Sequence, residues 1–207
     1  MASTIIHIAV AKKVLEEVGT SNPKDYYLGS IAPDLSKQLG DNRVRSHFFE
    51  NQFTDIPNIK AFCQKYPDYK TNSFNLGYFV HLYTDKLWAE DFLIKMREKK
   101  TITFDNGTTI STDGKEFVDM LYTDYTNLNI QVINKYDLEL SLFYEDFVVP
   151  DTSIEEIPVE KLDILINKMS ILIENSKGEK SYLIDISMVE EFIEKASKEI
   201  INYLQEK

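Results

Sequence analysis

Residues 73–88 read SFNLGYFVHLYTDKLW, and their apolar rhythm predicts a helix that continues to about residue 99. The stripe that this helix turns inward contains Phe74, Tyr78, His81, Asp85, Trp88 and Phe92. Because an amphipathic helix buries its stripe, the sequence places a histidine and a carboxylate in the protein interior. Basic residues near residue 99 suit the negative end of the helix dipole.

The region before this stretch is also mainly helical. Periodicity predicts a helix over residues 3–18, ended by Gly19, and another between Pro57 and Pro67. Residues 20–55 are irregular, with short helical turns expected around residues 23–28 and after Asp34. In this irregular segment, polar residues need not follow the helical alternation of buried and exposed positions.

After residue 99 the helical pattern of apolar residues is interrupted once by a pattern typical of strands. Two threonine-rich runs flank Asp105-Asn106-Gly107 and predict a small β-hairpin near residues 101–112. Helices are then expected over 115–136, 154–175 and 186–205. Ser153 with Glu156 suggests a capping box for the second of these, and Asp185 or Ser187 begins the third. The fold class is therefore all-α, a multi-helix bundle with a small β-hairpin, in a single helical domain over residues 1–207.

The charge balance narrows the class of partner. The 207 residues contain 23 Lys and Arg against 34 Asp and Glu, a net charge of −11. This charge repels a phosphate backbone, so we expect no extended nucleic acid as a partner and no stable membrane anchoring. The single cysteine, Cys63, excludes an internal disulfide framework and a cysteine-rich zinc module. We therefore expect a cytoplasmic protein.

The three histidines of the chain all lie in its first 81 positions. His7 shares an inward stripe with Ala11, Val14 and Val18, and His81 lies one helical turn before Asp85. A histidine and an aspartate at i and i+4 project side by side and can offer two ligands to one cation. This pair is common by chance, and a core histidine bonded to a backbone carbonyl is the alternative for each imidazole.

Two more candidates lie in the irregular segment. Asp34 follows Ala32-Pro33, where proline stiffens the chain, and His47 precedes two phenylalanines that can anchor it. Together with His7, His81 and Asp85 they make three imidazoles and two carboxylates. This donor set suits a zinc-like ion better than calcium or magnesium, which prefer oxygen.

Three further residues are weaker candidates. Asp124 lies on an otherwise apolar helical stripe, where it is either a metal ligand or the acceptor of a buried hydrogen bond. Arg43 and Arg45 are close to His47 and could bind a substrate phosphate, although a solvated surface pair is the alternative.

Four segments resemble the zinc-dependent phospholipase C family, which is related to single-strand-specific zinc nucleases. They are Thr4–His7, Leu28-Gly-Ser-Ile-Ala-Pro-Asp34, Ser46-His47-Phe48 and Gly77–Trp88, and they occur in the family's order. The resemblance implies an all-α bundle of the phospholipase C and nuclease type with zinc between its helices. It implies that Asp34, His47, His81 and Asp85 hold one zinc ion and that His7 and Asp85 begin a second site. It also implies that Asp34 orients or deprotonates the attacking water.

The chain departs from that family in two ways. Secreted members carry later histidine ligands, whereas no histidine follows His81 here. They also use a mature N-terminal tryptophan as a metal ligand, whereas this sequence begins Met1-Ala2-Ser3. One or two zinc ions are therefore expected rather than a full set of three.

These patterns predict a metal-dependent hydrolase of phosphoric esters that acts on a small phosphoester through a metal-activated water, with Asp34 as the catalytic base. A non-catalytic helical domain with a structural or vestigial metal site is the alternative. A histidine–aspartate-domain phosphohydrolase requires adjacent His and Asp, and none of the three histidines is followed by Asp.

Overall fold

The computed structural model describes residues 1–51, 56–176 and 181–206. Its first helix, α1 (Thr4–Val18), begins where the Ser3 side chain accepts a hydrogen bond from the Ile6 N–H. It ends at Gly19, whose φ of +66° an L side chain rarely adopts. The predicted helix over residues 3–18 is therefore confirmed.

The helices α2 (Pro23–Ile31) and α5 (Ser73–Trp88) form the closest helix pair. Each contributes a glycine to the crossing. A Cβ atom on Gly29 would collide with the Phe74 carbonyl, and one on Gly77 would collide with the Tyr26 carbonyl. Only glycine allows the two backbones this approach, which brings the end of α2 beside the middle of α5.

Short elements connect this pair to the rest of the bundle. A 3-10 turn, η1 (Ala32–Asp34), follows α2 and leads into α3 (Leu35–Gln38), and α4 (Ile59–Lys65) precedes α5. After α5 the chain continues through a π-helical turn, η2 (Ala89–Leu93), into α6 (Ile94–Glu98). The helix predicted to run unbroken to residue 99 is thus three segments with one common direction.

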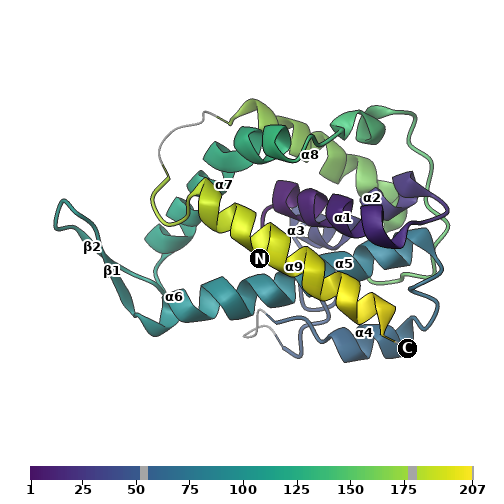
Figure 1. Cartoon of the computed structure of the whole chain (residues 1–207), viewed down its shortest axis with the longest axis horizontal. Coiled ribbons are helices and arrows are strands. Elements are labelled where there is room, and N and C mark those ends of the chain that lie inside the picture. Colours follow the sequence, from purple (N-terminus) through teal and green to yellow (C-terminus); the bar gives the residue numbers. More distant parts are fainter. Residues whose placement is uncertain (52–55, 177–180, 207) are drawn as a thin grey trace.

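The predicted β-hairpin is present. Strands β1 (Thr101–Thr103) and β2 (Thr109–Ser111) pair antiparallel, with Ile102 opposite Ile110. Gly107, with φ of +82°, makes the turn. The hairpin projects from one end of the molecule (Figure 1).

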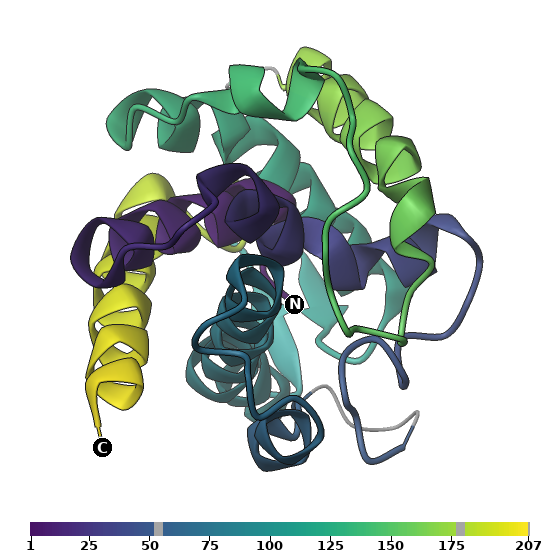
Figure 2. The same cartoon turned by 90° about the vertical axis from the view of Figure 1, so that its right-hand side faces the viewer.

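The second half of the chain supplies three long helices: α7 (Lys115–Lys135), α8 (Leu162–Glu174) and α9 (Ile186–Gln205). Two 3-10 turns, η3 (Leu140–Tyr144) and η4 (Val159–Lys161), lie between α7 and α8. Helix α9 begins at the predicted cap Asp185, whose side chain accepts from the Met188 N–H. Figure 2 shows α9 and α8 on opposite sides of α1.

The predicted start of α8 is wrong. Residues 154–158 are not helical, and no capping box forms at Ser153. The Glu156 carboxylate instead binds the Tyr66 hydroxyl and the Lys65 ammonium, which holds this segment against α4. Within the described part of the chain, none of the helices is both long and apolar enough to cross a membrane.

Candidate metal centre

Two of the histidines are each held in orientation by a contact at their own Nδ1 atom. The Nδ1 atom of His81, on α5, lies 2.8 Å from the Ser30 carbonyl oxygen on α2. The Nδ1 atom of His47 lies 2.9 Å from the Ser46 hydroxyl. A partner on Nδ1 sets the ring orientation and leaves Nε2 as the coordinating atom, as in protein zinc sites. The glycine crossing of α2 and α5 therefore orients a candidate ligand.

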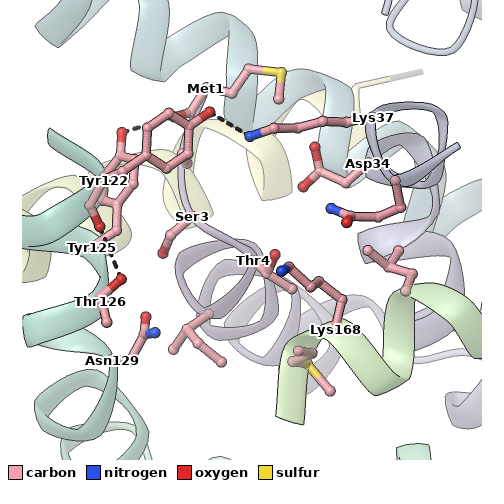
Figure 3. Close-up of a pocket in the computed structure, with 15 residues that line it drawn as sticks. Met1, Ser3, Thr4, Asp34, Lys37, Tyr122, Tyr125, Thr126, Asn129 and Lys168 are labelled. Atoms are coloured by element: carbon pink, nitrogen blue, oxygen red, sulfur yellow. Dashed lines mark hydrogen bonds between the residues drawn. The ribbon is translucent and has the colours of Figure 1, made fainter. Parts of the chain in front are cut away.

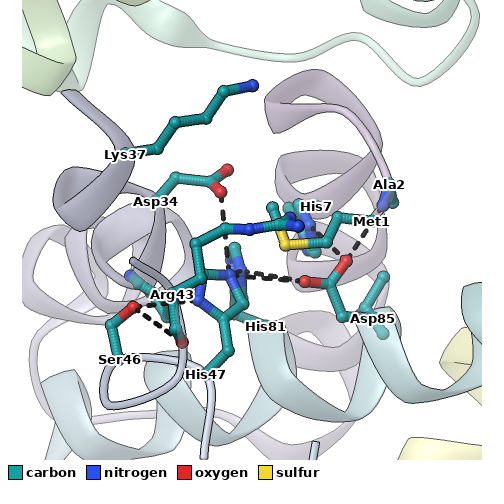
Figure 4. Close-up of polar contacts among 12 residues, drawn as sticks. Met1, Ala2, His7, Asp34, Lys37, Arg43, Ser46, His47, His81 and Asp85 are labelled. Atoms are coloured by element: carbon teal, nitrogen blue, oxygen red, sulfur yellow. Dashed lines mark hydrogen bonds and ion pairs between the residues drawn. The ribbon is translucent and has the colours of Figure 1, made fainter. Parts of the chain in front are cut away.

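The donor atoms of four side chains lie near one another (Figure 4). His47 Nε2 is 3.4 Å from His81 Nε2, and each nitrogen is 3.5 Å from Asp85 Oδ2. Asp34 Oδ1 is 3.7 Å from His47 Nε2. Two zinc–nitrogen bonds at a tetrahedral angle separate their nitrogens by about 3.3 Å. The spacing of the donors of His47, His81 and Asp85 therefore matches one face of a zinc coordination tetrahedron, whereas Asp34 forms a second possible metal-binding group with His7 and His81.

His7 approaches the cluster from α1. Its ring stacks on that of His81, with centroids 3.8 Å apart and planes 10° apart, and its Nε2 lies 3.2 Å from Asp85 Oδ1. The backbone N–H of Ala2 donates to the same oxygen at 2.9 Å. Asp85 thus faces His7 with one oxygen and the pair His47 and His81 with the other, the position expected of a bridging carboxylate.

Burial makes this arrangement costly without a further partner. All three histidines and Asp85 are at most 1% exposed. Among the described residues, both ring nitrogens of His7 lack a hydrogen bond of normal geometry, and so do Asp34 Oδ1 and Asp85 Oδ2. Buried polar atoms without hydrogen bonds are rare, and here they point at one another. A cation among them would be bound by one ring nitrogen of His7 and by the two carboxylate oxygens.

The charge states suit a cation. Burial and the neighbouring His81 lower the pKa of His7, and the same two causes hold the pKa of His47 well below its ordinary value. Burial favours a neutral Asp85, but His7 and His81 outweigh it and hold the pKa of this carboxyl well below its usual range. Burial also opposes protonation of His81, but Asp85 outweighs it and raises the pKa of this imidazole. The ionised form of Asp85 and the neutral forms of His7 and His47 are thereby favoured, as metal binding requires, whereas a metal ion would have to displace the proton of His81.

A strained loop presents His47. Phe48 has φ of +54°, in the left-handed region that phenylalanine rarely adopts. Its ring packs edge-on against Phe62, at 5.3 Å between centroids, which holds the turn in place. The predicted anchoring of His47 by its aromatic neighbours thus has a physical basis.

Two serines orient the ligands, although the sequence pattern alone gives neither of them a role. Ser30 and Ser46 lie within the segments that resemble the family, and both touch a histidine ring. Ser46 was recognisable as the direct neighbour of His47. Ser30 was not, because its carbonyl reaches His81 only through the contact between two helices.

The two candidate arginines lie in different surroundings. Figure 4 shows Arg43 extending across the cluster, and its positive charge contributes to the lowered pKa of His47. Arg45 is exposed and donates to the Glu155 carbonyl at 2.6 Å. Of the predicted pair, only Arg43 lies at the cluster.

The structure does not support Asp124 as a ligand. It belongs to neither group of residues that could hold a metal, which are His7, Asp34 and His81, and His47, His81 and Asp85. Its two oxygens accept hydrogen bonds of 2.6–3.0 Å from the backbone N–H groups of Tyr182, Leu183 and Ile184. The carboxylate holds the segment that leads into α9, so its burial has a structural cause.

Comparison with known proteins agrees with this geometry. Residues 6–88 match the family model of zinc-dependent phospholipase C, and all five converging residues fall within them. The family resemblance is thereby confirmed for this part of the chain, and the buried histidines and aspartates in it could hold a metal ion, as a zinc-dependent family requires. No curated protein and no solved structure matches it.

Proposed function

We propose that this chain, whose residues 6–88 carry the zinc-dependent phospholipase C family domain, is a zinc-dependent hydrolase of small phosphoric esters. One or two zinc ions would bind among His7, Asp34, His47, His81 and Asp85. Bound zinc supplies a water whose pKa falls to about 7 and a positive charge for phosphoryl oxygens.

The proposal depends on a difference in solvent access between Asp34 and the other four residues. His7, His47, His81 and Asp85 are enclosed, whereas Asp34 is 8% exposed and also lines a cavity. A structural zinc site is closed by its protein ligands, whereas a catalytic site keeps access for water and substrate. The cluster has such access on the Asp34 side.

The position of each residue indicates the role that it would have in hydrolysis. Asp34, at the boundary between cluster and cavity, would accept the proton of the attacking water. Arg43 extends across the cluster and would hold a phosphoryl oxygen with its guanidinium. Ser30 and Ser46 keep the two imidazoles aimed at the centre.

The test is metal content together with turnover. Elemental analysis of the purified chain should give one or two zinc ions per chain. Hydrolysis of bis(p-nitrophenyl) phosphate should disappear with chelator and return with added zinc. His81→Ala should lose both zinc and turnover, whereas Lys161→Gln, an exposed change in η4, should lose neither.

Two other results would contradict the proposed hydrolase. Full zinc occupancy without turnover on phosphodiesters and phosphomonoesters would establish the alternative of a structural or vestigial metal site. A folded chain that binds no transition metal at all would refute both readings.

A further inference from the structure

A cavity of about 240 Å³ opens beside Asp34 (Figure 3). The N-terminal turn of α1 contributes Ser3 and Thr4 to its wall, and α7 contributes Tyr122, Tyr125 and Asn129. The cavity is smaller than the roughly 300–1,000 Å³ typical of sites for drug-sized ligands. Since it reaches Asp34, it is where the part of a substrate that is not cleaved would lie.

Two lysines give this cavity a charge opposite to that of the molecule. Lys37 from α3 and Lys168 from α8 both line it, and Figure 3 shows them on facing sides. Its single acidic residue, Asp34, belongs to the metal cluster. Within the described residues Lys168 has no ion-pair partner, although the chain as a whole carries a net charge of −11. Lys168 is exposed, so water solvates its ammonium group, and an anion in the cavity would take the place of part of that water.

A buried amide is aimed into the same space. Asn129 is only 5% exposed, and among the described residues its side chain has no hydrogen-bond partner. Figure 3 shows it pointing into the cavity. The polar atoms of this amide are not among the buried atoms that lack a partner, so they meet water in the cavity, and a ligand with polar atoms would take the place of that water. The N-terminus of α1, a 15-residue helix, adds the positive end of its dipole at the cavity wall.

The aromatic wall does not suit a cation. A quaternary ammonium group binds over the open face of aromatic rings. Here the Lys37 ammonium already lies 4.2 Å from the centre of the Tyr122 ring and donates a hydrogen bond of 2.7 Å to the Tyr122 hydroxyl oxygen. A cationic ligand would compete with Lys37 for the ring and would be repelled by Lys168.

We propose that this cavity selects phosphoric esters whose second substituent carries a negative charge and that it rejects esters of cationic alcohols. The inference rests on the proposed function, since it names the substrate class of the same site. Lys168 and Asn129 would bind the anionic substituent while the phosphoryl group lies at the cluster.

Three phosphonates of matched length test the charge preference without hydrolysis, because their carbon–phosphorus bond is not an ester. They are 3-phosphonopropionate, 3-hydroxypropylphosphonate and 3-aminopropylphosphonate, which end in an anion, a neutral group and a cation. Titration calorimetry on the zinc-loaded chain should show affinity falling in that order. A lysine–carboxylate pair near the surface makes the first step about fivefold.

Variants assign the preference to the cavity. Lys168→Gln should bring the affinities of the anionic and neutral phosphonates within about twofold of each other, and Asn129→Leu should weaken the anionic one. The matched control Lys161→Gln should keep the wild-type order. Equal affinity for the three phosphonates, tighter binding of the amine, or no binding of any would overturn the inference. Charge selectivity without turnover of any ester would instead uphold the cavity assignment and refute the proposed hydrolase.

Discussion

Asp85 is the residue on which the candidate site depends most. One of its oxygens faces His7 and the Ala2 N–H, and the other faces His47 and His81. His81 belongs to both groups of residues that could hold a metal, and Asp85 faces an imidazole of each group with a different oxygen. The sequence identified this residue because a carboxylate on an apolar stripe needs a strong partner.

Changes at the two carboxylates should separate metal binding from catalysis. Asp85→Asn should weaken zinc binding about 100-fold or more, because the ionised oxygen faces two imidazoles and its replacement is neutral. Asp34→Asn should retain zinc when zinc is in excess but should lower turnover about 10²- to 10⁴-fold, since it removes the proton acceptor. Zinc titration and kinetics on both variants measure the two effects. Equal loss of zinc in both would remove the distinction.

Asp124 provides a second test at the scale of one residue. Asp124→Asn replaces one acceptor oxygen by a donor facing backbone N–H groups, so we expect a loss of about 1–3 kcal/mol in the free energy of unfolding. Zinc content should not change, because the carboxylate is bound to the segment before α9. Urea unfolding and elemental analysis measure the two quantities. Loss of zinc from a stably folded variant would restore Asp124 to the ligand set.

At the scale of elements, most helices follow from periodicity, and the wrong start of α8 has a physical cause. Helix α1 and the hairpin agree with the sequence prediction because local signals, Ser3 and Gly107, set their ends. The start of α8 does not, because Glu156 is used in contacts with Lys65 and Tyr66 rather than in a cap. Local motifs cannot show that a side chain is bound by a residue about 90 positions away.

The crossing of α2 and α5 is the element contact that positions the site. Gly77→Ala should lower the free energy of unfolding by about 2 kcal/mol or more, because the added methyl group meets a backbone carbonyl that cannot move alone. Separation of the helices would also shift the Ser30 carbonyl from His81, so zinc affinity should fall about tenfold. The two readouts are urea unfolding and zinc titration.

Gly114→Ala is the matched control for this substitution. The atom nearest to its added methyl group would be the Ser111 carbonyl oxygen, at 3.3 Å. We expect a change below about 1 kcal/mol and unaltered zinc binding. If Gly77→Ala behaved like this control, the close crossing would not be what holds His81 in place.

At the scale of the whole molecule, buried tyrosines predict a loss of stability in alkali. Burial raises the pKa of Tyr27 to about 12, and it raises those of Tyr26, Tyr78 and Tyr125 well above 10. Above pH 10 the unfolded chain releases these protons while the folded chain keeps them. The unfolded state then binds fewer protons, so the free energy of unfolding falls as the pH rises from 10 toward 12.

Urea unfolding followed by circular dichroism at pH 9, 10 and 11 measures this slope. Tyr27→Phe should reduce it, because one of the groups that gains a proton on folding is removed. A free energy of unfolding that stayed constant over this range would show that the folded chain releases its tyrosine protons as readily as the unfolded chain does.

The zinc site should also stabilise the whole chain, because its ligands come from segments spread over residues 7–85 and meet only in the folded state. Zinc at 100 times its dissociation constant adds about 2.7 kcal/mol to the free energy of unfolding. For a chain of this length that raises the Tm by about 5–10 °C. Thermal unfolding with chelator and with added zinc measures the shift, and His47→Asn should abolish most of it. A wild-type Tm that zinc does not change would mean that the buried imidazoles and carboxylates satisfy one another without a metal, and the proposed chemistry would have no source.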